Sequence, residues 1–248
     1  MWAAPPDEVR GFVRVRPSAK GLGVGAALLA WVERRADQIA NELSLAPEAA
    51  LTLTNWAQDR DAPPLLEGAG FVPVRHFLQM RIDLAGTHLP EPVWPECLET
   101  RCFRPGPDDA ALFASFREAF ADHWGGAEVN AEDWWTENRT APNAGFDPTL
   151  WFLALDGRAL AGFSLCRERE ADGEATGWIS LLGVRPPWRG RGLGEALLRQ
   201  SLTVLRDRGR RRAALNVDVA NTTGAQRLYE KVGMEPVPAF TVWSKPIV

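Results

Sequence analysis

The chain has 248 residues, enough for one large or two small domains, and its 46% hydrophobic and 24% charged residues are ordinary for a globular protein. A formal net charge of −4 argues against a dedicated nucleic-acid binder, because phosphate contacts need a basic surface. The longest apolar run, 21–32, is much shorter than a membrane span, and the N-terminus lacks the apolar core of a secretory signal.

The cysteine content bears on compartment and on metal binding. Cys97, Cys102 and Cys166 are an odd number and form no CxxC pair, which favours reduced thiols in the cytoplasm over a disulfide framework. No grouping of histidine, cysteine and acidic residues has the spacing of a metal site, so no metal is expected.

The first half of the chain opens with a glycine-rich stretch at 16–29, RPSAKGLGVGAALL. An apolar helix is predicted after it, followed by an alternating strand in 51–59 and a short helix before Gly70. The same order returns in the second half, where 185–198 reads RPPWRGRGLGEALL and the short helix precedes Gly233. The chain is therefore an internal duplication.

The two copies are unequal in extent. The second has roughly 85 residues ahead of its glycine loop, counted from Glu99, whereas the first has only about 20. The additional residues predict a strand in 99–104, helices in 108–122 and 130–139, and two strands around the turn at 156–157. Either the sequence begins inside the first copy, or the first copy is a remnant that packs on the second.

We expect a partial, catalytically inactive lobe in 1–84, a proline-rich linker in 85–98 and a complete lobe in 99–248. The complete lobe continues with a strand in 178–184 and a helix in 192–208. The broad apolar face of that helix predicts that it packs on a sheet.

The glycine-rich stretch between strand and helix predicts an anion site. The first N–H groups of a helix lack internal partners, and glycines let a phosphate approach the backbone. Arg189 and Arg191 can add charge-assisted hydrogen bonds. The spacing is neither GxxxxGK[ST] nor GxGxxG, so a nucleoside triphosphate loop and a dinucleotide fingerprint are both disfavoured. The alternative is an ordinary strand–helix turn.

With these residues the chain resembles the GCN5-related N-acetyltransferase (GNAT) superfamily. The coenzyme A loop of that family matches Arg189, Gly192 and Gly194, and its second signature matches the stretch from Asn221 to Met234. The tandem arrangement is similar to that of mycothiol synthase relatives. The resemblance implies a mixed α/β fold whose central, mostly antiparallel sheet is flanked by helices, complete in the C-terminal domain and partial in the N-terminal lobe.

The resemblance also implies acetyl transfer from acetyl-CoA to a primary amine of a small molecule or peptide, directly within a ternary complex. No nucleic-acid or membrane partner is expected, because the chain is acidic and its apolar runs are short. Backbone groups of the strand would hold the pantetheine arm and the thioester oxygen, the loop would hold the pyrophosphate, and an asparagine would contact the arm. The implied residues are Leu182, Gly183, Val184, Arg189, Gly190, Arg191, Gly192, Leu193, Gly194, Glu195, Asn221 and Ala225.

Tyr229 is the only tyrosine of the chain, and the resemblance makes it the acid that protonates the departing thiolate. A phenol with a reference pKa of about 10 stays protonated at neutral pH and can donate to a thiolate of pKa about 8.5. The alternative is an aromatic that packs the last helix on the sheet. The matching residue of the first lobe is Leu66, which cannot donate a proton.

The chain departs from the family where the attacking ammonium must lose a proton. Many members place a glutamate on the strand before the loop, and here Trp178 and Ser180 stand there. The candidate bases are Asp218, Glu174, His123 and Glu128. Asp218 could instead serve as a structural hydrogen-bonding residue, and His123 as a capping or surface imidazole.

Two further patterns have more than one interpretation. The run at 206–212 is basic, but cations complement a helix C-terminus, so a solvated helix end is preferred. Aromatic residues gather where the family builds its acceptor site, and they would either line a pocket or pack in the core. They are Trp124, Trp134, Trp135, Phe146, Trp151 and Phe152.

The acceptor itself is not indicated. Mycothiol synthase relatives carry Pro-Glu-Gln after a similar histidine and a tyrosine before the strand aspartate. This chain has Trp124-Gly125-Gly126 and Asn216 there, so the resemblance does not carry the mycothiol precursor over as acceptor. The alternative function is a non-catalytic coenzyme A-binding sensor or scaffold, which the missing strand carboxylate favours and Tyr229 disfavours.

Overall fold

The computed structural model describes residues 8–123, 129–142, 144–171, 174–221 and 223–247. These residues fall into two compact units. The C-terminal unit comprises Gln79–Val217 and Asn221–Val237, and the N-terminal unit lies within Ala4–Leu78, Asp218–Ala220 and Pro238–Val248. No helix in the described ranges is long and apolar enough to cross a bilayer.

The N-terminal unit is a small α/β layer. Its elements are β1 (Glu8–Gly11), α1 (Val24–Leu43), β2 (Ala50–Trp56), α2 (Ala62–Gly68), the first part of β3 (Val72–Asp83) and the last part of β9 (Glu235–Pro246). β1 and β2 are parallel and are joined through α1, as a strand–helix–strand unit requires. The core beneath α1 and α2 includes Leu29, Leu53 and Phe71.

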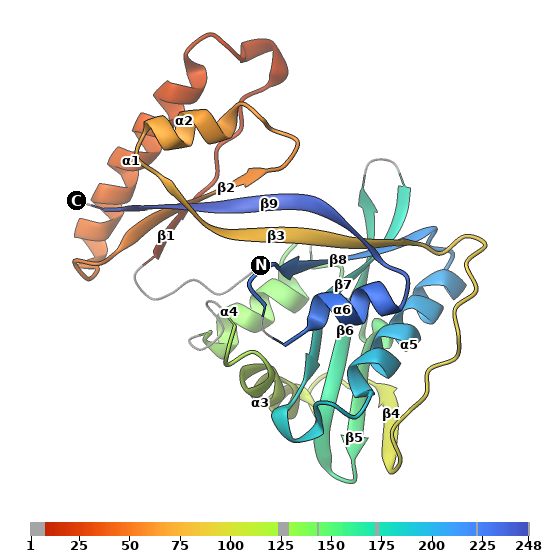
Figure 1. Cartoon of the computed structure of the whole chain (residues 1–248). Coiled ribbons are helices and arrows are strands. Elements are labelled where there is room, and N and C mark those ends of the chain that lie inside the picture. The colour runs from red at the N-terminus through yellow and green to blue at the C-terminus, as the bar shows by residue number, and fades with distance from the viewer. Residues whose placement is uncertain (1–7, 124–128, 143, 172–173, 222, 248) are drawn as a thin grey trace. The chain divides into compact units, whose positions relative to one another are not determined.

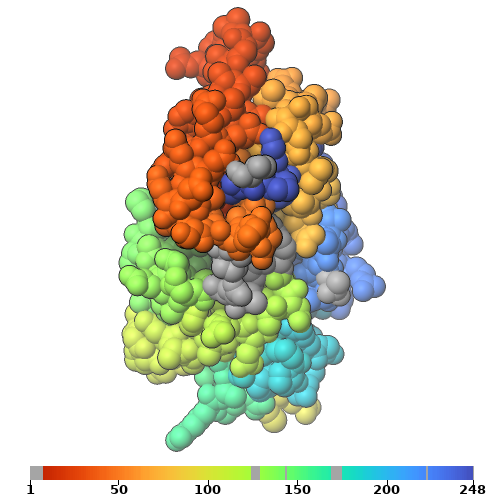
Figure 2. All heavy atoms as spheres, turned by 90° about the vertical axis from the view of Figure 1, so that its left-hand side faces the viewer, coloured from red at the N-terminus to blue at the C-terminus, as the bar shows by residue number. Residues whose placement is uncertain are grey.

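The last strand of the chain completes the N-terminal unit. β9 runs antiparallel to β2, with Pro246 opposite Ala50 and Phe240 opposite Trp56. In Figure 2, blue atoms of this strand lie among the orange atoms of the N-terminal residues. The compact units therefore do not follow the order of the chain, and the expected boundaries at 1–84, 85–98 and 99–248 stay a prediction.

The C-terminal unit contains a larger mixed sheet. Its own elements are β4 (Leu98–Cys102), α3 (Asp109–Ala119), α4 (Ala131–Trp135), β5 (Trp151–Asp156), β6 (Ala159–Ala171), β7 (Glu174–Val184), α5 (Leu193–Asp207), β8 (Arg212–Asp218) and α6 (Ala225–Lys231). β4 to β7 form an antiparallel meander, and β8 adds to β7 in parallel. This mixed, mostly antiparallel sheet with flanking helices confirms the predicted fold class.

Glycines let α3 and α5 pack closely on opposite faces of the sheet (Figure 1). A Cβ at Gly177 would lie 2.7 Å from Leu205 of α5, and one at Gly183 would lie 3.1 Å from Phe120, which follows α3. The first contact is shorter than those of real Cβ atoms and the second is tighter than most, so a side chain at either strand position would force its neighbours to shift. The predicted helices at 108–122 and 192–208 thus correspond to α3 and α5.

Two predicted elements differ in extent. The helix expected at 130–139 ends as α-helix at Trp135 and continues as a wider π-helical turn over Thr136–Thr140. The strand expected to begin at Trp178 begins at Glu174, because it pairs with β6 along that whole length. The long strand β3 was not individually expected, whereas β9 corresponds to the strand expected after the last helix of the second lobe.

Candidate functional site

The glycine-rich loop joins β7 to the N-terminus of α5. A short 3₁₀ turn, Pro186–Trp188, precedes Gly190 and Gly192, whose φ angles of 74° and 85° lie in the left-handed region. Side chains with a Cβ are strained there, which explains both glycines. Apart from the adjacent residues of the loop, no atom of the described residues lies within 4 Å of a Cβ built at either position, so the backbone is open there. Unpaired first-turn N–H groups of α5 belong to the same region.

The third glycine of the loop serves packing instead. Gly194 lies inside α5, and a Cβ there would meet Leu228 of α6 at 3.3 Å and Val184 of β7 at 3.6 Å. The absent side chain lets α6 approach the start of α5 closely. In the GxGxG motif, the backbone conformation therefore favours glycine at 190 and 192, and close packing favours glycine at 194.

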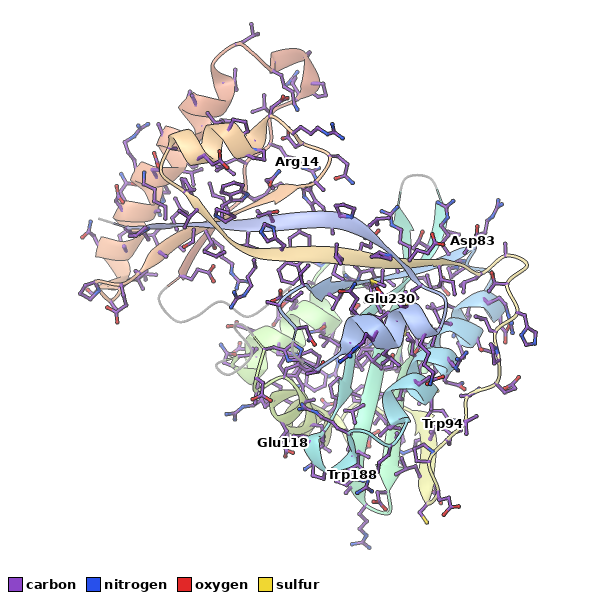
Figure 3. All side chains as sticks on the ribbon, viewed as in Figure 1. Arg14, Asp83, Trp94, Glu118, Trp188 and Glu230 are labelled. Carbon is purple, nitrogen blue, oxygen red and sulfur yellow. The ribbon has the colours of Figure 1, made fainter. Side chains whose placement is uncertain are left out.

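The loop is anchored at its base by Arg185. Its guanidinium donates to both carboxylate oxygens of Glu118 at 2.7 and 2.9 Å and lies 5.0 Å from the centroid of the Trp188 ring. Figure 3 labels Glu118 and Trp188 at this end of the sheet. These contacts connect the base of the loop to α3.

The two arginines of the loop do different things. Arg189 donates through Nε to the Val184 carbonyl at 3.1 Å and through Nη2 to the Ala119 carbonyl at 3.0 Å. Arg191 is exposed, and no ion pair joins it to any side chain that the structure describes. Arg191 is thus the cation that is available to an anion, whereas Arg189 fixes the loop to the neighbouring backbone.

Glu195 places a carboxylate in the first turn of α5. Lys231, at 2.6 Å, and Arg199, at 2.8 Å, hold the pKa of Glu195 below its usual value. These partners neutralise a charge that would otherwise repel a phosphate at the helix N-terminus. Leu193 is fully buried and secures the first turn in the core.

β7 has an open edge beside the loop. Its pairing with β8 covers only Thr176 to Trp178, opposite Arg212 to Ala214. Its pairing with β6 slips by one residue at Ser180, which is a β-bulge. Within the described sheet, Leu182, Gly183 and Val184 therefore have a strand neighbour on one side, and backbone groups on the other side can meet a ligand.

Tyr229 lies on α6, a short helix that begins at Ala225 after Gly224. Its side chain is buried, and burial raises its pKa from 10.0 to about 12. No hydrogen bond joins its hydroxyl to another residue in the described part of the chain. The hydroxyl is therefore protonated at neutral pH and is not committed to an internal partner.

Asn221 and His123 are brought together although they are 98 positions apart. The amide nitrogen of Asn221 lies 3.0 Å from Nε2 of His123. The amide oxygen of Asn221 accepts from the backbone N–H of Thr223 at 2.8 Å and from its hydroxyl at 2.6 Å. The turn before α6 is thus tied to the end of α3.

The other candidate bases are placed as follows. Asp218 lies in the N-terminal unit, where its carboxylate is 3.6 Å from Arg75 and accepts from the Ala220 N–H at 2.8 Å. Glu174 begins β7, but its side chain is not among those described, and Glu128 lies outside the described residues, as does Trp124. The partners of Asp218 are those of a structural carboxylate.

Asn216 is a candidate that sequence reasoning did not single out for chemistry. Ala214 is opposite Trp178 in the parallel register, so Asn216, two residues on, points to the same face as Trp178. Its amide oxygen is inaccessible and has no hydrogen-bond partner among the described groups. Buried amide groups without a hydrogen-bond partner are uncommon in proteins. Asn216 lies two residues beyond the last pair of β7 and β8.

The aromatic cluster is mainly core. Trp134, Trp151 and Phe152 are buried. Trp135 and Phe146 surround an internal cation, since the Arg139 guanidinium carbon lies 4.2 and 5.4 Å from their ring centroids. Arg139 in turn pairs with Asp109 at 2.7 Å. The cation that contacts these rings is therefore a side chain of the protein itself, Arg139.

The first copy of the loop keeps the backbone and changes the charges. Gly21 and Gly23 have φ angles of 78° and 77°, and a Cβ at Gly25 would lie 3.1 Å from Leu65. Lys20 is held by Asp59 and by Asp61, each at 2.8 Å, and these hydrogen bonds raise the pKa of Lys20. The duplication thus extends to the geometry of the loop, whereas Leu22 stands at the position of the free Arg191.

Comparison with known proteins gives consistent results. The model of the "Acetyltransferase (GNAT) family" matches residues 110–234. A mycothiol acetyltransferase of Thermobispora bispora is 35% identical over all of this chain and 77% of its own length, and one of Salinispora arenicola is 34% identical over 94% and 75%.

Solved structures add the fold. A GCN5-related N-acetyltransferase from Sphaerobacter thermophilus aligns with a TM-score of 0.76 and 34% identity, covering 97% of this chain and 73% of that one. A tandem GNAT protein from the clavulanic acid biosynthesis pathway aligns with a TM-score of 0.72 at 17% identity, covering 96% and 75%. The second likeness concerns the fold alone. Together they confirm the resemblance, the tandem type and the acyltransferase class predicted from the sequence.

Proposed function

Because the chain belongs to the GNAT family of acetyltransferases, we propose that it transfers an acetyl group from acetyl-CoA to a primary amine of a small molecule or peptide. The observation that carries the proposal is the open loop at the start of α5, with Gly190 and Gly192 in left-handed conformations and Arg191 exposed. Backbone N–H groups at such a turn suit the coenzyme pyrophosphate. The open edge of Leu182 to Val184 suits the pantetheine arm.

Tyr229 acts as the general acid in this proposal. The amine nitrogen forms a bond to the thioester carbonyl carbon, the carbon–sulfur bond breaks, and the Tyr229 proton passes to the sulfur. The nitrogen releases one proton to solvent as the amide forms, and the Tyr229 phenolate regains a proton from solvent. Burial raises the pKa of Tyr229 to about 12, so its hydroxyl keeps its proton at neutral pH until the thiolate departs.

The acceptor ammonium must lose its proton before it attacks. Asp218 is the carboxylate among the candidate bases whose side chain is described, and its bonds to Arg75 and Ala220 favour a structural role. The variant Asp218→Asn tests whether this residue also serves as the base. A lower kcat would support that role, and an unchanged kcat would mean that the proton leaves to solvent.

The first lobe has no catalytic role in this proposal. Leu66, buried in α2, stands where α6 carries Tyr229, and Leu22 stands where the loop carries Arg191. Lys20 is neutralised by two carboxylates. We therefore expect one equivalent of acetyl-CoA to bind per chain.

Calorimetric titration of acetyl-CoA tests the site, with Arg191→Glu and its first-lobe counterpart Leu22→Glu as matched variants. Arg191→Glu should abolish binding, and Leu22→Glu should leave it unchanged. Two equivalents in the wild-type protein would overturn the assignment of the first lobe. The absence of any binding heat or thermal stabilisation at saturating ligand would overturn the proposed function.

Measurement of kcat tests whether Tyr229 is the general acid. With a panel of primary amines as acceptors, including amino acids, amino sugars, polyamines and peptide N-termini, Tyr229→Phe should lower kcat by roughly 10²-fold or more while acetyl-CoA affinity changes little. An unchanged kcat would remove Tyr229 from the mechanism. Tight acetyl-CoA binding with no turnover on any acceptor would support the alternative, a non-catalytic sensor or scaffold.

A further inference from the structure

The C-terminal turn of α3 is bonded to both sides of the opening between β7 and β8. On the β7 side, Arg189 of the loop donates to the Ala119 carbonyl at 3.0 Å. On the side of the turn after β8, Asn221 meets His123 at 3.0 Å. Carbonyls at a helix C-terminus lack internal partners, so the Arg189 bond also satisfies one of them.

The orientation of the Asn221 amide is determined by Thr223. The backbone N–H of Thr223 can only donate, and it lies 2.8 Å from the Asn221 amide oxygen. The other end of the amide, the NH2 group, therefore faces His123. A flipped amide would set two donors against each other at Thr223.

This orientation fixes the state of the imidazole. An NH2 group donates, so Nε2 of His123 must accept with its lone pair, and the ring carries its proton on Nδ1. A doubly protonated ring would place an N–H against the amide NH2. Nε2 of His123 therefore cannot take a substrate proton while the bond to Asn221 persists.

The ring itself is held from the sheet side. The Phe120 and His123 centroids are 4.7 Å apart, and Phe120 lies against the sheet at Gly183. The His123 backbone N–H also donates to the Phe120 carbonyl at 3.0 Å. A chain of contacts thus runs from Gly183 on β7 through Phe120 and His123 to Asn221.

We propose that His123 is a positioning residue for coenzyme binding: it holds the Asn221 side chain in the orientation that contacts the pantetheine arm and couples that side chain to the Arg189-bound turn of α3. The inference rests on the proposed function, because it takes the coenzyme contact of Asn221 from there. It assigns His123 a role other than the general base.

The experiment measures acetyl-CoA affinity and kcat for His123→Ala, His123→Gln and Asn221→Ala. His123→Ala should weaken acetyl-CoA binding about five-fold, as expected for one lost hydrogen bond. His123→Gln should restore most of the affinity, because its side-chain carbonyl can accept from Asn221. The double variant His123→Ala/Asn221→Ala should bind no more weakly than Asn221→Ala alone. His88→Ala, at an exposed histidine of the same unit, is the matched control and should bind like the wild type.

The outcomes separate the two proposals. Failure of the wild-type protein to bind acetyl-CoA would overturn the proposed function. Normal binding by the wild type with equal binding by His123→Ala, or additive losses in the double variant, would overturn the positioning role alone. Nitrogen NMR of the histidine ring in the wild-type protein needs no variant to fold: an unprotonated Nε2 at neutral pH is expected, and a protonated Nε2 would refute the inference.

Discussion

Tyr229 can be titrated by itself, because it is the only tyrosine in the chain and tryptophan does not ionise. The experiment raises the pH and follows the ionisation of this one phenol. Burial raises the Tyr229 pKa from 10.0 to about 12. At pH 10 a solvated phenol is half ionised, whereas a phenol with this raised pKa is about 1% ionised. The folded protein should therefore show almost no tyrosinate at pH 10.

The same shift links Tyr229 to stability. A shift of about two pKa units corresponds to about 3 kcal/mol. The folded-state pKa is raised above the unfolded one, so this contribution is fully present below pH 10 and is lost as the pH rises from 10 to 12. Tyr229→Phe should not show this part of the alkaline loss, and the difference between the two proteins isolates it.

The assay is the near-ultraviolet absorbance of tyrosinate as a function of pH, with circular dichroism at each step to confirm that the protein is folded. The same titration in denaturant should give the ordinary value of about 10. Tyr229→Phe provides the blank and should show no transition. Half-ionisation near pH 10 in the folded protein would refute the reasoning, because it would show that water reaches the hydroxyl.

Three stability predictions follow from buried and strained positions. Asn216→Leu should raise the free energy of unfolding by about 1 kcal/mol, because it removes an unpaired buried amide oxygen; a lower Tm would show that the amide is paired in solution. In urea unfolding, Gly192→Ala should cost about 1 kcal/mol and Gly192→Asn less, since asparagine tolerates the left-handed region better, and equal costs would argue against that backbone. Asp108→Asn should cost about 2 kcal/mol at pH 7, because it breaks the buried pair with Arg101. Arg101 holds the pKa of Asp108 well below its usual range, so this contribution is lost as pH falls below about 4, and an equal cost at pH 3 and pH 7 would contradict it.

Local sequence patterns predicted much of the fold and part of the candidate site. The glycines before two apolar helices predicted the loops, since Gly190 and Gly192 are needed by the backbone of the turn itself. The apolar spacing of α5 predicted its packing on the sheet. Both features depend on residues within one turn or one helix of each other, which is why sequence alone could predict them.

Contacts between distant residues were not accessible in this way. The positive charge of Arg189 was evident from the sequence. The carbonyl groups to which it donates, those of Val184 and Ala119, belong to β7 and α3 and could not be identified from the sequence. The bond between His123 and Asn221 joins positions 98 apart, and no periodicity in the sequence records it. Side-chain chemistry could be read from the sequence, whereas the partner that determines how each side chain is used could not.

The pairing of β9 with β2 has a consequence for biosynthesis. Ala50 of β2 is synthesised 196 residues before Pro246, its antiparallel partner on β9 (246 − 50). Until then, the hydrogen-bonding edge of β2 is exposed and can pair with other strands. The sheet of the N-terminal unit can therefore be completed only after residues 240–246 have been synthesised.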